Sequence, residues 1–436
     1  MKHTTILVIG GGAAGISAAI AARRSAEHLG KSCTITLLER NARPGTKIRI
    51  SGGGKCNVTH RGTPAELLDK GFLRLNEKRF LRHAFYAFSN SNLLDLLRSR
   101  GVEFAERADG KVFPISGEAS SVVVAFEELL RKSSVQQHFS SRVRSVERKG
   151  ELFLVTVADA SFTAEVVILA TGGVSYSRTG TTGDGLAIAR ALGHSIKSSV
   201  AALAPVYTQK APPASLSGIS LRSAALVASA GGRSVERRGD LLFTHRGISG
   251  PVALSLSRDI AELCTEFGSA SLFADFFPEQ SLAELEEQLL LHARKSGAQM
   301  VRKFLQSCAM APYRGAFTEM PHGTIPTAII PFLMHQATLE NLVTWSSLTK
   351  ENRQLLITTL KRFPLGTAGN VPLDQGEVSA GGVVLGEVNP KTMQSRIIPK
   401  LFLCGELLDY AGEIGGFNLQ AAFSTGWMAG SYAACS

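Results

Sequence analysis

Three glycines near the N-terminus have the spacing of a phosphate-binding turn. Gly10, Gly12 and Gly15 form a Gly-x-Gly-x-x-Gly string between an apolar run and an alanine-rich segment. Where such a string joins a strand to a helix, the first glycine permits the tight turn, the second lets the backbone approach a pyrophosphate, and the third lets helix and strand pack closely. The helix N-terminus then offers unpaired N–H groups to the phosphates. The string alone is a weak signal, so its context decides.

An acidic residue stands where the ribose of such a nucleotide would lie. Glu39 ends the apolar run that follows the alanine-rich segment, so its carboxylate is placed to accept hydrogen bonds from ribose hydroxyls. An acid at this place favours an unphosphorylated adenosine ribose, which means FAD or NAD rather than NADP.

The order of the remaining glycine-rich strings favours FAD over NAD. Residues 51–57, Ser-Gly-Gly-Gly-Lys-Cys-Asn, follow soon after Glu39 and lead into a long excursion, whereas an NAD domain would continue into another βαβ unit. Buried strands of the nucleotide-binding fold are expected again only at 165–170 and 401–404. The first is followed by Thr171-Gly172 and the second by Gly405. The alternative for residues 51–57 is a mobile surface loop.

The C-terminal string repeats the logic of the first one. Gly405 ends a short strand, Asp409 can reach the ribityl or phosphate region, and Gly415-Gly416 opens the last helix. The N-terminus of that helix would point at the pyrimidine side of the isoalloxazine, where negative charge develops on reduction and backbone N–H groups stabilise it. Between the two strings, residues 179–185 resemble the TGDG segment of fumarate-reductase-type flavoproteins. We expect a helix-capping turn there, with Asp184 as a direct flavin ligand as the alternative.

The elements that must position these strings are expected to form one nucleotide-binding domain with an insertion. We expect a parallel strand at 4–9, a helix at 13–29, a strand at 33–38, a hairpin at 143–157 and a closing helix at 418–434. Residues 1–195, with a mostly helical excursion at 63–132, and residues 371–436 are predicted to form the FAD-binding domain. Residues 196–370 are predicted to form an inserted domain. The fold class is therefore α/β.

Composition and charge limit the function classes. No apolar run is long enough to span a membrane and nothing at the start resembles a secretory signal, so we expect a cytoplasmic protein without a membrane partner. The six cysteines are scattered without zinc spacing, so we expect no structural metal. The net charge is +11, and Arg74–Arg100 is rich in Lys and Arg. A solvated surface that also attracts an anionic cofactor explains this charge, and so does a surface that meets a polyanion such as RNA.

Several of these strings together resemble one known family. Residues 10–15, 51–57, 113–116, 242–251 and 381–420 look like the BaiN-like flavoprotein family over essentially the whole chain. The resemblance implies FAD, a Rossmann-like FAD-binding domain (a two-dinucleotide-binding-fold flavoprotein), and an inserted β-barrel-like plus helical domain. It also implies reduction of a carbon–carbon double bond, in a steroid enone or in uridine of large-subunit ribosomal RNA. Two departures are Lys55, where Arg is common, and Phe417, where Tyr is common. The cofactor-binding residues expected from the strings and the resemblance are Gly10, Gly12, Ala14, Gly15, Glu39, Arg40, Lys47, Ser51, Gly52, Gly53, Gly54, Lys55, Asn57, Val143, Thr171, Gly172, Gly405, Glu406, Asp409, Gly415, Gly416, Phe417 and Asn418.

Reducing a polarised double bond also needs an acid within hydrogen-bond reach of the substrate. Cys56 and His245 are the candidate catalytic residues, and Tyr176 and Glu413 also lie in glycine-rich strings. Cys56 can equally be a small buried hydrophobe, and His245 can cap a turn or hold the inserted domain. The chain has no second Gly-x-Gly-x-x-Gly string, so NAD(P)H is expected as a transient electron donor, with another protein as the alternative. A flavin oxidase, and an RNA-binding factor in which FAD is structural, remain open; the sequence predicts no oligomeric state.

Overall fold

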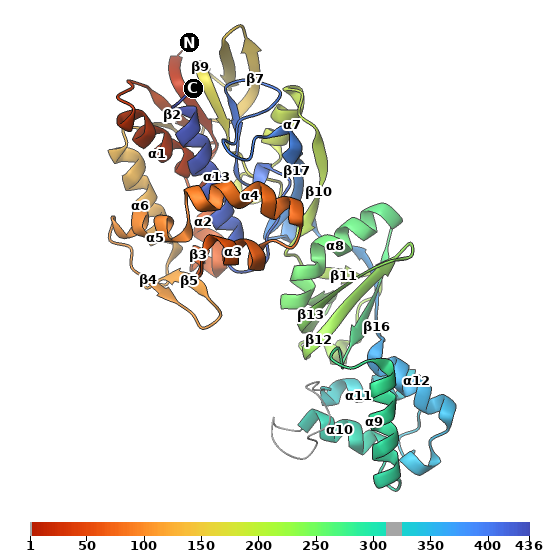
Figure 1. Cartoon of the computed structure of the whole chain (residues 1–436). Coiled ribbons are helices and arrows are strands. Elements are labelled where there is room, and N and C mark those ends of the chain that lie inside the picture. The colour runs from red at the N-terminus through yellow and green to blue at the C-terminus, as the bar shows by residue number, and fades with distance from the viewer. Residues whose placement is uncertain (1, 311–324) are drawn as a thin grey trace. The chain divides into compact units, whose positions relative to one another are not determined.

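The structure is a computed structural model that describes residues 2–310 and 325–436 (Figure 1). It divides into two compact units, residues 1–199 with 377–436 (unit 1) and residues 200–376 (unit 2). The division lies within a few residues of the boundaries expected from the sequence. Both termini therefore belong to the same unit, and unit 2 interrupts it.

Unit 1 is built on a seven-stranded sheet. Its strand order is β6-β2-β1-β9-β8-β7, with β18 paired to β9. β1 lies between β2 and β9 and runs parallel to both. β18 runs parallel to β9, so the C-terminal strand joins the same sheet as the N-terminal strand, as the sequence predicts. The strands are β1 (Lys2–Ile9), β2 (Ile35–Leu38), β6 (Gln136–His138), β7 (Val143–Lys149), β8 (Leu152–Val157), β9 (Ser161–Leu169) and β18 (Leu401–Leu403).

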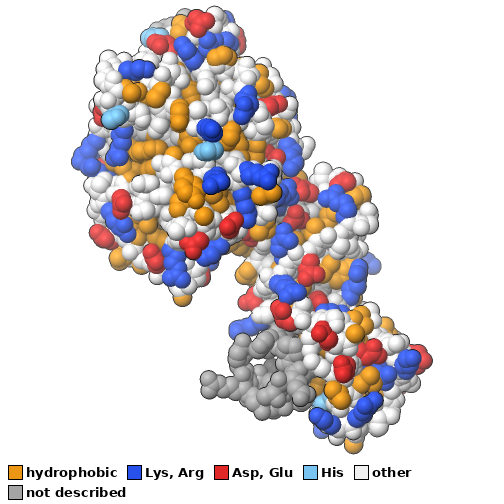
Figure 2. Space-filling model, in the orientation of Figure 1, with side chains coloured by type: hydrophobic (Ala, Val, Ile, Leu, Met, Phe, Trp, Pro, Cys, Tyr) orange, Lys and Arg blue, Asp and Glu red, His pale blue; other side chains and the backbone are white. Residues whose placement is uncertain are grey.

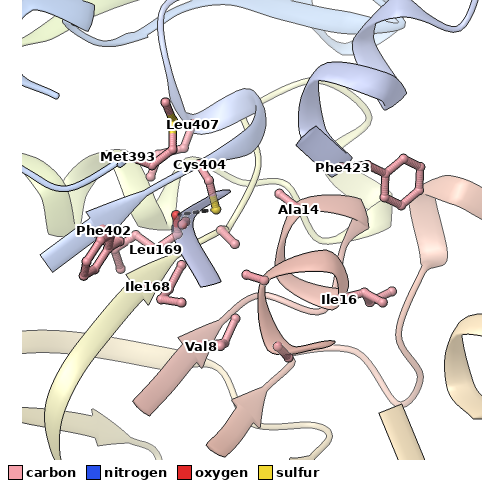
Figure 3. Packing of buried hydrophobic residues seen from close by; sticks show 14 of the residues in the cluster. Val8, Ala14, Ile16, Ile168, Leu169, Met393, Phe402, Cys404, Leu407 and Phe423 are labelled. Carbon is pink, nitrogen blue, oxygen red and sulfur yellow. Dashed lines mark hydrogen bonds between the residues drawn. The ribbon is translucent and has the colours of Figure 1, made fainter. Parts of the chain in front are cut away.

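Two helices from opposite ends of the chain pack together against this sheet. They are α1 (Ala13–His28) and α13 (Phe417–Ala433). A Cβ on Gly426 or Gly430 of α13 would lie 2.1 or 2.0 Å from a carbonyl oxygen of α1, so both positions need glycine for this close approach. The core between helices and strands includes Val8, Phe402 and Phe423 (Figure 3). The buried strands are apolar on both faces, as expected for a covered parallel sheet.

The excursion after β2 is mostly helical and carries a small sheet. The short strands β3 (Thr59–His60), β4 (Phe104–Glu106) and β5 (Lys111–Pro114) pair in the order β3-β5-β4. The break in helical periodicity near residues 110–114 is therefore a strand. The helices are α2 (Thr46–Ile50), α3 (Pro64–Gly71), α4 (Leu75–Ala87), α5 (Asn90–Arg98) and α6 (Ala119–Lys132), and α7 (Asp184–Ala191) follows β9.

Unit 2 is a closed barrel with helices, which confirms the predicted inserted architecture. The barrel order is β11-β14-β13-β12-β15-β16, and α8 (Pro251–Phe267) packs on its strands. Its strands are β11 (Val206–Thr208), β12 (Ser220–Ala230), β13 (Arg233–Thr244), β14 (Gly247–Ser249), β15 (Ala270–Asp275) and β16 (Phe363–Asn370). The helices are α9 (Leu282–Lys295), α10 (Val301–Met310), α11 (Ile330–Gln336) and α12 (Lys350–Lys361). A further pair, β10 (Ile196–Ala202) with β17 (Val378–Val383), lies where the chain leaves and re-enters unit 1.

Candidate functional site: a dinucleotide cradle at the edge of the sheet

The glycine string lies at the carboxyl end of β1. Two of its glycines are closely packed against the backbone, and one faces open space. Gly10 has φ +108°, and its N–H donates to the Leu38 carbonyl at 2.8 Å. A Cβ on Gly15 would lie 1.8 Å from the Gly10 carbonyl oxygen, whereas a Cβ on Gly12 would meet no atom within 4 Å. Gly10 and Gly15 are therefore required by packing. Gly12 instead leaves room beside the turn, as a bound pyrophosphate requires.

The N-terminus of α1 is free to bind an anion. Gly12 is its N-cap residue and supplies no side-chain hydrogen bond, so the first-turn N–H groups have no capping side chain. Ala14 is buried in this first turn, and a Cβ on Gly405 would lie 2.7 Å from the Ala14 Cβ. Ala14 therefore supports the cradle by packing, and the C-terminal Gly405 closes against it.

Glu39 lies at the end of β2, beside the glycine turn. Its Oε2 accepts the Gly11 N–H at 2.6 Å and its Oε1 accepts the Asn41 N–H at 2.7 Å. These bonds fix the carboxylate, and each oxygen keeps a lone pair that could accept a ribose hydroxyl. Burial raises the pKa of Glu39 because desolvation disfavours the charged form, and the two backbone N–H donors oppose that shift.

Arg40 and Asp184 belong to one surface network near this end of the site. Arg40 Nη1 donates to Thr182 Oγ1 at 2.6 Å and lies 3.3 Å from Asp184 Oδ2. Arg142 donates two hydrogen bonds to the Asp184 carboxylate, at 2.7 and 2.8 Å, and these bonds lower the pKa of Asp184. The N-cap residue of α7 is Gly183, and it makes no side-chain cap. The turn at 179–185 thus lies at the start of α7 as expected, and Asp184 holds two arginines.

A hydrogen-bonded cluster joins α2, the segment after β9 and the segment after β18. Lys47 Nζ donates to Glu406 Oε2 at 2.8 Å and to Ser175 Oγ at 2.7 Å. Glu406 Oε1 accepts the Ser175 hydroxyl at 3.1 Å and the Ser379 N–H at 2.8 Å. The ion pair is largely shielded from solvent, with 25% of the Lys47 side chain and 17% of the Glu406 side chain exposed. Two predicted residues thus come together with two serines that the sequence reasoning missed.

The strand end at Thr171-Gly172 completes this edge of the sheet. Gly172 has φ +75°, and a Cβ on Gly173 would lie 2.0 Å from Ser379 Oγ. Thr171 Oγ1 is buried and has no hydrogen-bond partner among the described residues. The chain after β9 therefore turns tightly along β17 and leaves hydrogen-bonding capacity unused at the strand end.

The N-terminus of α13 lies at Gly415-Gly416, and its side chains mostly hold the backbone. Gly416 has φ +88°, and a Cβ there would lie 2.7 Å from the Thr59 backbone. The Asn418 amide exchanges two hydrogen bonds of 2.8 Å with the Gly412 backbone. Phe417 is buried and stacks on His60, with ring centroids 4.9 Å apart. Asn418 and Phe417 therefore hold the turn that begins α13, whose N-cap residue Gly416 supplies no side-chain cap.

Asp409 is also engaged within the protein. Its Oδ1 accepts the Gly381 N–H at 3.1 Å, and Lys197 Nζ lies 3.5 Å from Oδ2. The carboxylate thus ties the segment after β18 to β17.

Val143, at the start of β7, is buried, and Ser141 two residues before it donates its N–H to the Glu39 carbonyl at 2.8 Å. Val143 therefore begins a strand only two residues after Ser141, the residue that bonds the Glu39 backbone.

The glycine-rich loop after α2 is exposed. Gly52, Gly53 and Gly54 all have left-handed φ, and a Cβ on Gly53 or Gly54 would meet nothing within 4 Å. Lys55 is exposed as well. Ser51 Oγ donates to the Ile48 carbonyl at 2.8 Å, and Asn57 Oδ1 accepts the Val112 N–H at 3.2 Å, so both ends of the loop are anchored while its centre presents bare backbone.

The proton-donor candidates lie in different places. Cys56 is fully buried in the hydrophobic core, and burial raises its pKa to about 11, so it packs as a small hydrophobe. His245 is exposed in the turn between β13 and β14 of unit 2. Glu413 donates its N–H to the Gly71 carbonyl at 2.7 Å. Tyr176 is 37% exposed and follows Ser175 of the hydrogen-bonded cluster. The core position of Cys56 argues against its predicted catalytic role.

These parts together fit FAD. Open space faces Gly12, two helix N-termini lack side-chain caps, and a buried acid ends β2. Gly10–Gly15 with α1 would hold the pyrophosphate, Glu39 the ribose, and the backbone at Gly415-Gly416 the isoalloxazine. Within residues 2–310 and 325–436, no group of three or more His, Cys, Asp or Glu side chains is arranged to hold a metal ion. Over those same ranges, no helix has the length and apolar character needed to cross a membrane.

Comparison with known proteins places the chain in a family. Residues 4–432 match the family described as HI0933-like protein Rossmann domain. The chain belongs to this family. Members of the HI0933-like family are FAD-binding oxidoreductases, and the resemblance noted from the sequence strings is confirmed.

Curated relatives match this HI0933-like chain over nearly its full length. It is 33% identical to a 3-dehydro-bile acid delta(4,6)-reductase of Clostridium scindens, over 98% of each chain. It is 28% identical to a ribosomal RNA dihydrouridine synthase of Escherichia coli, over 98% of this chain and 97% of that one. Among solved structures, a 3-ketosteroid delta1-dehydrogenase of Sterolibacterium denitrificans shares the fold, with a TM-score of 0.53, 12% identity and full coverage of both chains.

Proposed function

We propose that this protein is an FAD-dependent reductase of a carbon–carbon double bond conjugated with a carbonyl group, and that its leading substrate is uridine in large-subunit ribosomal RNA. The observation that carries the proposal is the cradle built by Gly12, Glu39 and the N-terminus of α13 in a chain that matches two reductive relatives end to end. The uracil ring of uridine and an unsaturated 3-ketone share one electrophile, a double bond polarised by a carbonyl. One active site chemistry therefore serves both kinds of substrate.

The bound flavin supplies a hydride to the substrate, and the protein supplies binding, orientation and charge stabilisation. The first-turn N–H groups of α13, which its N-cap residue Gly416 leaves without a side-chain cap, would stabilise negative charge on the reduced cofactor. The Lys47–Glu406 pair fixes α2 against the segment after β18, and Ser175 joins the segment after β9 to both side chains. NAD(P)H is proposed as the transient electron donor.

An exposed face of α4 supports an RNA substrate. Figure 2 shows Lys and Arg side chains mixed with apolar ones over α4. Arg79, Arg82, His83 and Tyr86 are all exposed at spacings of three, four and seven residues, and Arg82 lies over the Tyr86 ring at 5.9 Å. This α4 face offers phosphate-binding charge beside an aromatic ring, as single-stranded RNA requires. Lys78, by contrast, pairs with Asp69 at 3.0 Å and is already engaged.

A small enone is the second candidate substrate, because the bile acid reductase relative has 33% identity. An RNA-binding protein in which FAD is structural is the alternative of another class. The test is anaerobic reduction of the purified holoprotein by NADPH or NADH, followed by mixing with a ribosomal RNA fragment or with a steroid 4-en-3-one. Reoxidation of the flavin by the RNA, with dihydrouridine in the product, supports the proposal. Reoxidation by the steroid alone favours the enone, and a flavin that neither pyridine nucleotide reduces favours the structural role.

A further inference from the structure

Tyr176 has a strained backbone that its neighbours hold in place. Its φ of +49° lies in the left-handed region, which is uncommon for a bulky residue and concentrates at functional sites. The preceding Ser175 is fully buried and is fixed by Lys47 at 2.7 Å and by Glu406 at 3.1 Å. Thr181 also donates its hydroxyl to the Ser175 carbonyl. Both sides of the turn therefore impose the conformation of Tyr176.

The strained turn leaves the phenol partly exposed on the segment that follows the carboxyl end of β9. Tyr176 follows the end of β9, the strand next to β1, and ligands of such sheets bind beyond the carboxyl ends of the strands. The side chain is 37% exposed, and its hydroxyl has no hydrogen-bond partner within the described ranges. Of the four acids that the sequence suggests, Tyr176 is the one that is exposed in unit 1, since Cys56 is buried, Glu413 is half-buried and His245 lies in unit 2.

A carboxylate acts on this phenol, and two lysines act on that carboxylate. Glu377 stands two residues before Ser379, whose hydroxyl lies 3.0 Å from Glu406 Oε1, so the start of β17 runs beside Ser175-Tyr176. Burial and then the charge of Glu377 raise the pKa of Tyr176, which keeps the phenol protonated at neutral pH. Desolvation raises the pKa of Glu377 itself, and Lys111 and Lys47 oppose that shift. Glu377 is exposed, and the surrounding protein nevertheless raises its pKa. Both features are typical of a side chain that lines an open site.

We propose that Tyr176 is the proton donor of the reaction and that Glu377, directly before β17 where that strand runs beside Ser175, is a positioning residue. This inference rests on the proposed function. When bound and reduced, FAD would supply a hydride to the β-carbon of the substrate, and Tyr176 would give its phenolic proton to the α-carbon, where a C–H bond forms as the O–H bond breaks. The double bond gains two electrons, which NAD(P)H restores to the flavin. The exposed phenolate regains its proton from solvent before the next turnover.

The test separates the two half-reactions in Tyr176→Phe, with Tyr432→Phe as the control because Tyr432 is 44% exposed and lies at the end of α13. Flavin content and reduction by NAD(P)H should stay at wild-type values in both variants. Reoxidation by the probe that the wild-type protein reduces, a ribosomal RNA fragment or a steroid 4-en-3-one, should slow by about 10²-fold or more in Tyr176→Phe only, as expected for loss of a general acid.

Glu377→Gln tests the positioning role by a pH profile. Removing the negative charge lowers the pKa of Tyr176, so the loss of reoxidation rate at high pH should begin at lower pH than in the wild-type protein. The ultraviolet absorption of tyrosinate gives a second readout without substrate, because the titration step missing from Tyr176→Phe should move to lower pH in Glu377→Gln. If Tyr176→Phe loses its flavin, the shift of the tyrosinate titration in Glu377→Gln tests the positioning role without the cofactor.

The possible failures are distinguishable. If the wild-type protein reduces neither probe, the proposed function falls and this inference falls with it. If the wild-type protein reduces a probe and Tyr176→Phe reduces it at an equal rate, the proposed function stands and Tyr176 is not the donor. An unchanged pH profile and an unchanged tyrosinate titration in Glu377→Gln would remove Glu377 from the account.

Discussion

Gly12→Val separates cofactor binding from folding. A Cβ at Gly12 meets no atom within 4 Å, and the backbone at φ −82° and ψ −171° suits a β-branched residue, so the apoprotein should keep its stability. The new side chain fills the space beside the uncapped N–H groups of α1. Losing two hydrogen bonds to charged phosphate, at about 1.5–3 kcal/mol each, should weaken FAD binding roughly 10²- to 10⁴-fold.

The assay pairs a flavin-fluorescence titration with thermal unfolding of the apoprotein. Gly386→Val is the matched control, because a Cβ there also meets open space in a segment outside the cradle. Gly15→Val should instead lower the stability of the apoprotein, since its Cβ would lie 1.8 Å from a carbonyl oxygen. Wild-type FAD affinity in Gly12→Val would refute the placement of the pyrophosphate.

Three further outcomes follow from the same contacts. Gly430→Leu should lower the melting temperature strongly, because even a Cβ would lie 2.0 Å from a carbonyl oxygen of α1; an unchanged melting temperature would contradict the packing of the two helices. Iodoacetamide at pH 8 should alkylate the exposed Cys435 and spare Cys56 in the native protein, because a pKa of about 11 leaves about one Cys56 in a thousand as thiolate; fast labelling of Cys56 would show that it is accessible. Arg79→Gln with Arg82→Gln should weaken RNA binding and flatten its salt dependence by about one unit of slope per lost phosphate contact, with unchanged flavin content; unchanged RNA affinity would remove the α4 face from the argument.

Local sequence patterns predicted the frame of unit 1 well. The glycine string, the apolar strands and the acid at Glu39 are contiguous features whose spacing alone dictates a βαβ unit. The return of β18 to the same sheet was also predictable, because an apolar strand followed by Gly405-Glu406 repeats the N-terminal pattern.

Long-range contacts were not predictable from such patterns. Ser175 and Ser379 lie 204 positions apart in the sequence numbering and both bond Glu406, and serine is too common in turns to mark either position. Cys56 stands in an exposed-looking glycine-rich string, yet the chain turns back at left-handed φ and buries the thiol. Phe417 likewise is buried and stacks on His60. Each outcome depends on tertiary packing.

Nucleoside mass spectrometry of large-subunit ribosomal RNA tests the central claim most directly. RNA is compared from cells that lack the gene, from the same cells supplied with the wild-type chain, and from cells supplied with Gly12→Val. If the protein reduces uridine in this RNA, a dihydrouridine should disappear with the gene, return with the wild-type chain and stay absent with Gly12→Val. The same dihydrouridine content in all three RNA samples would contradict the proposed function.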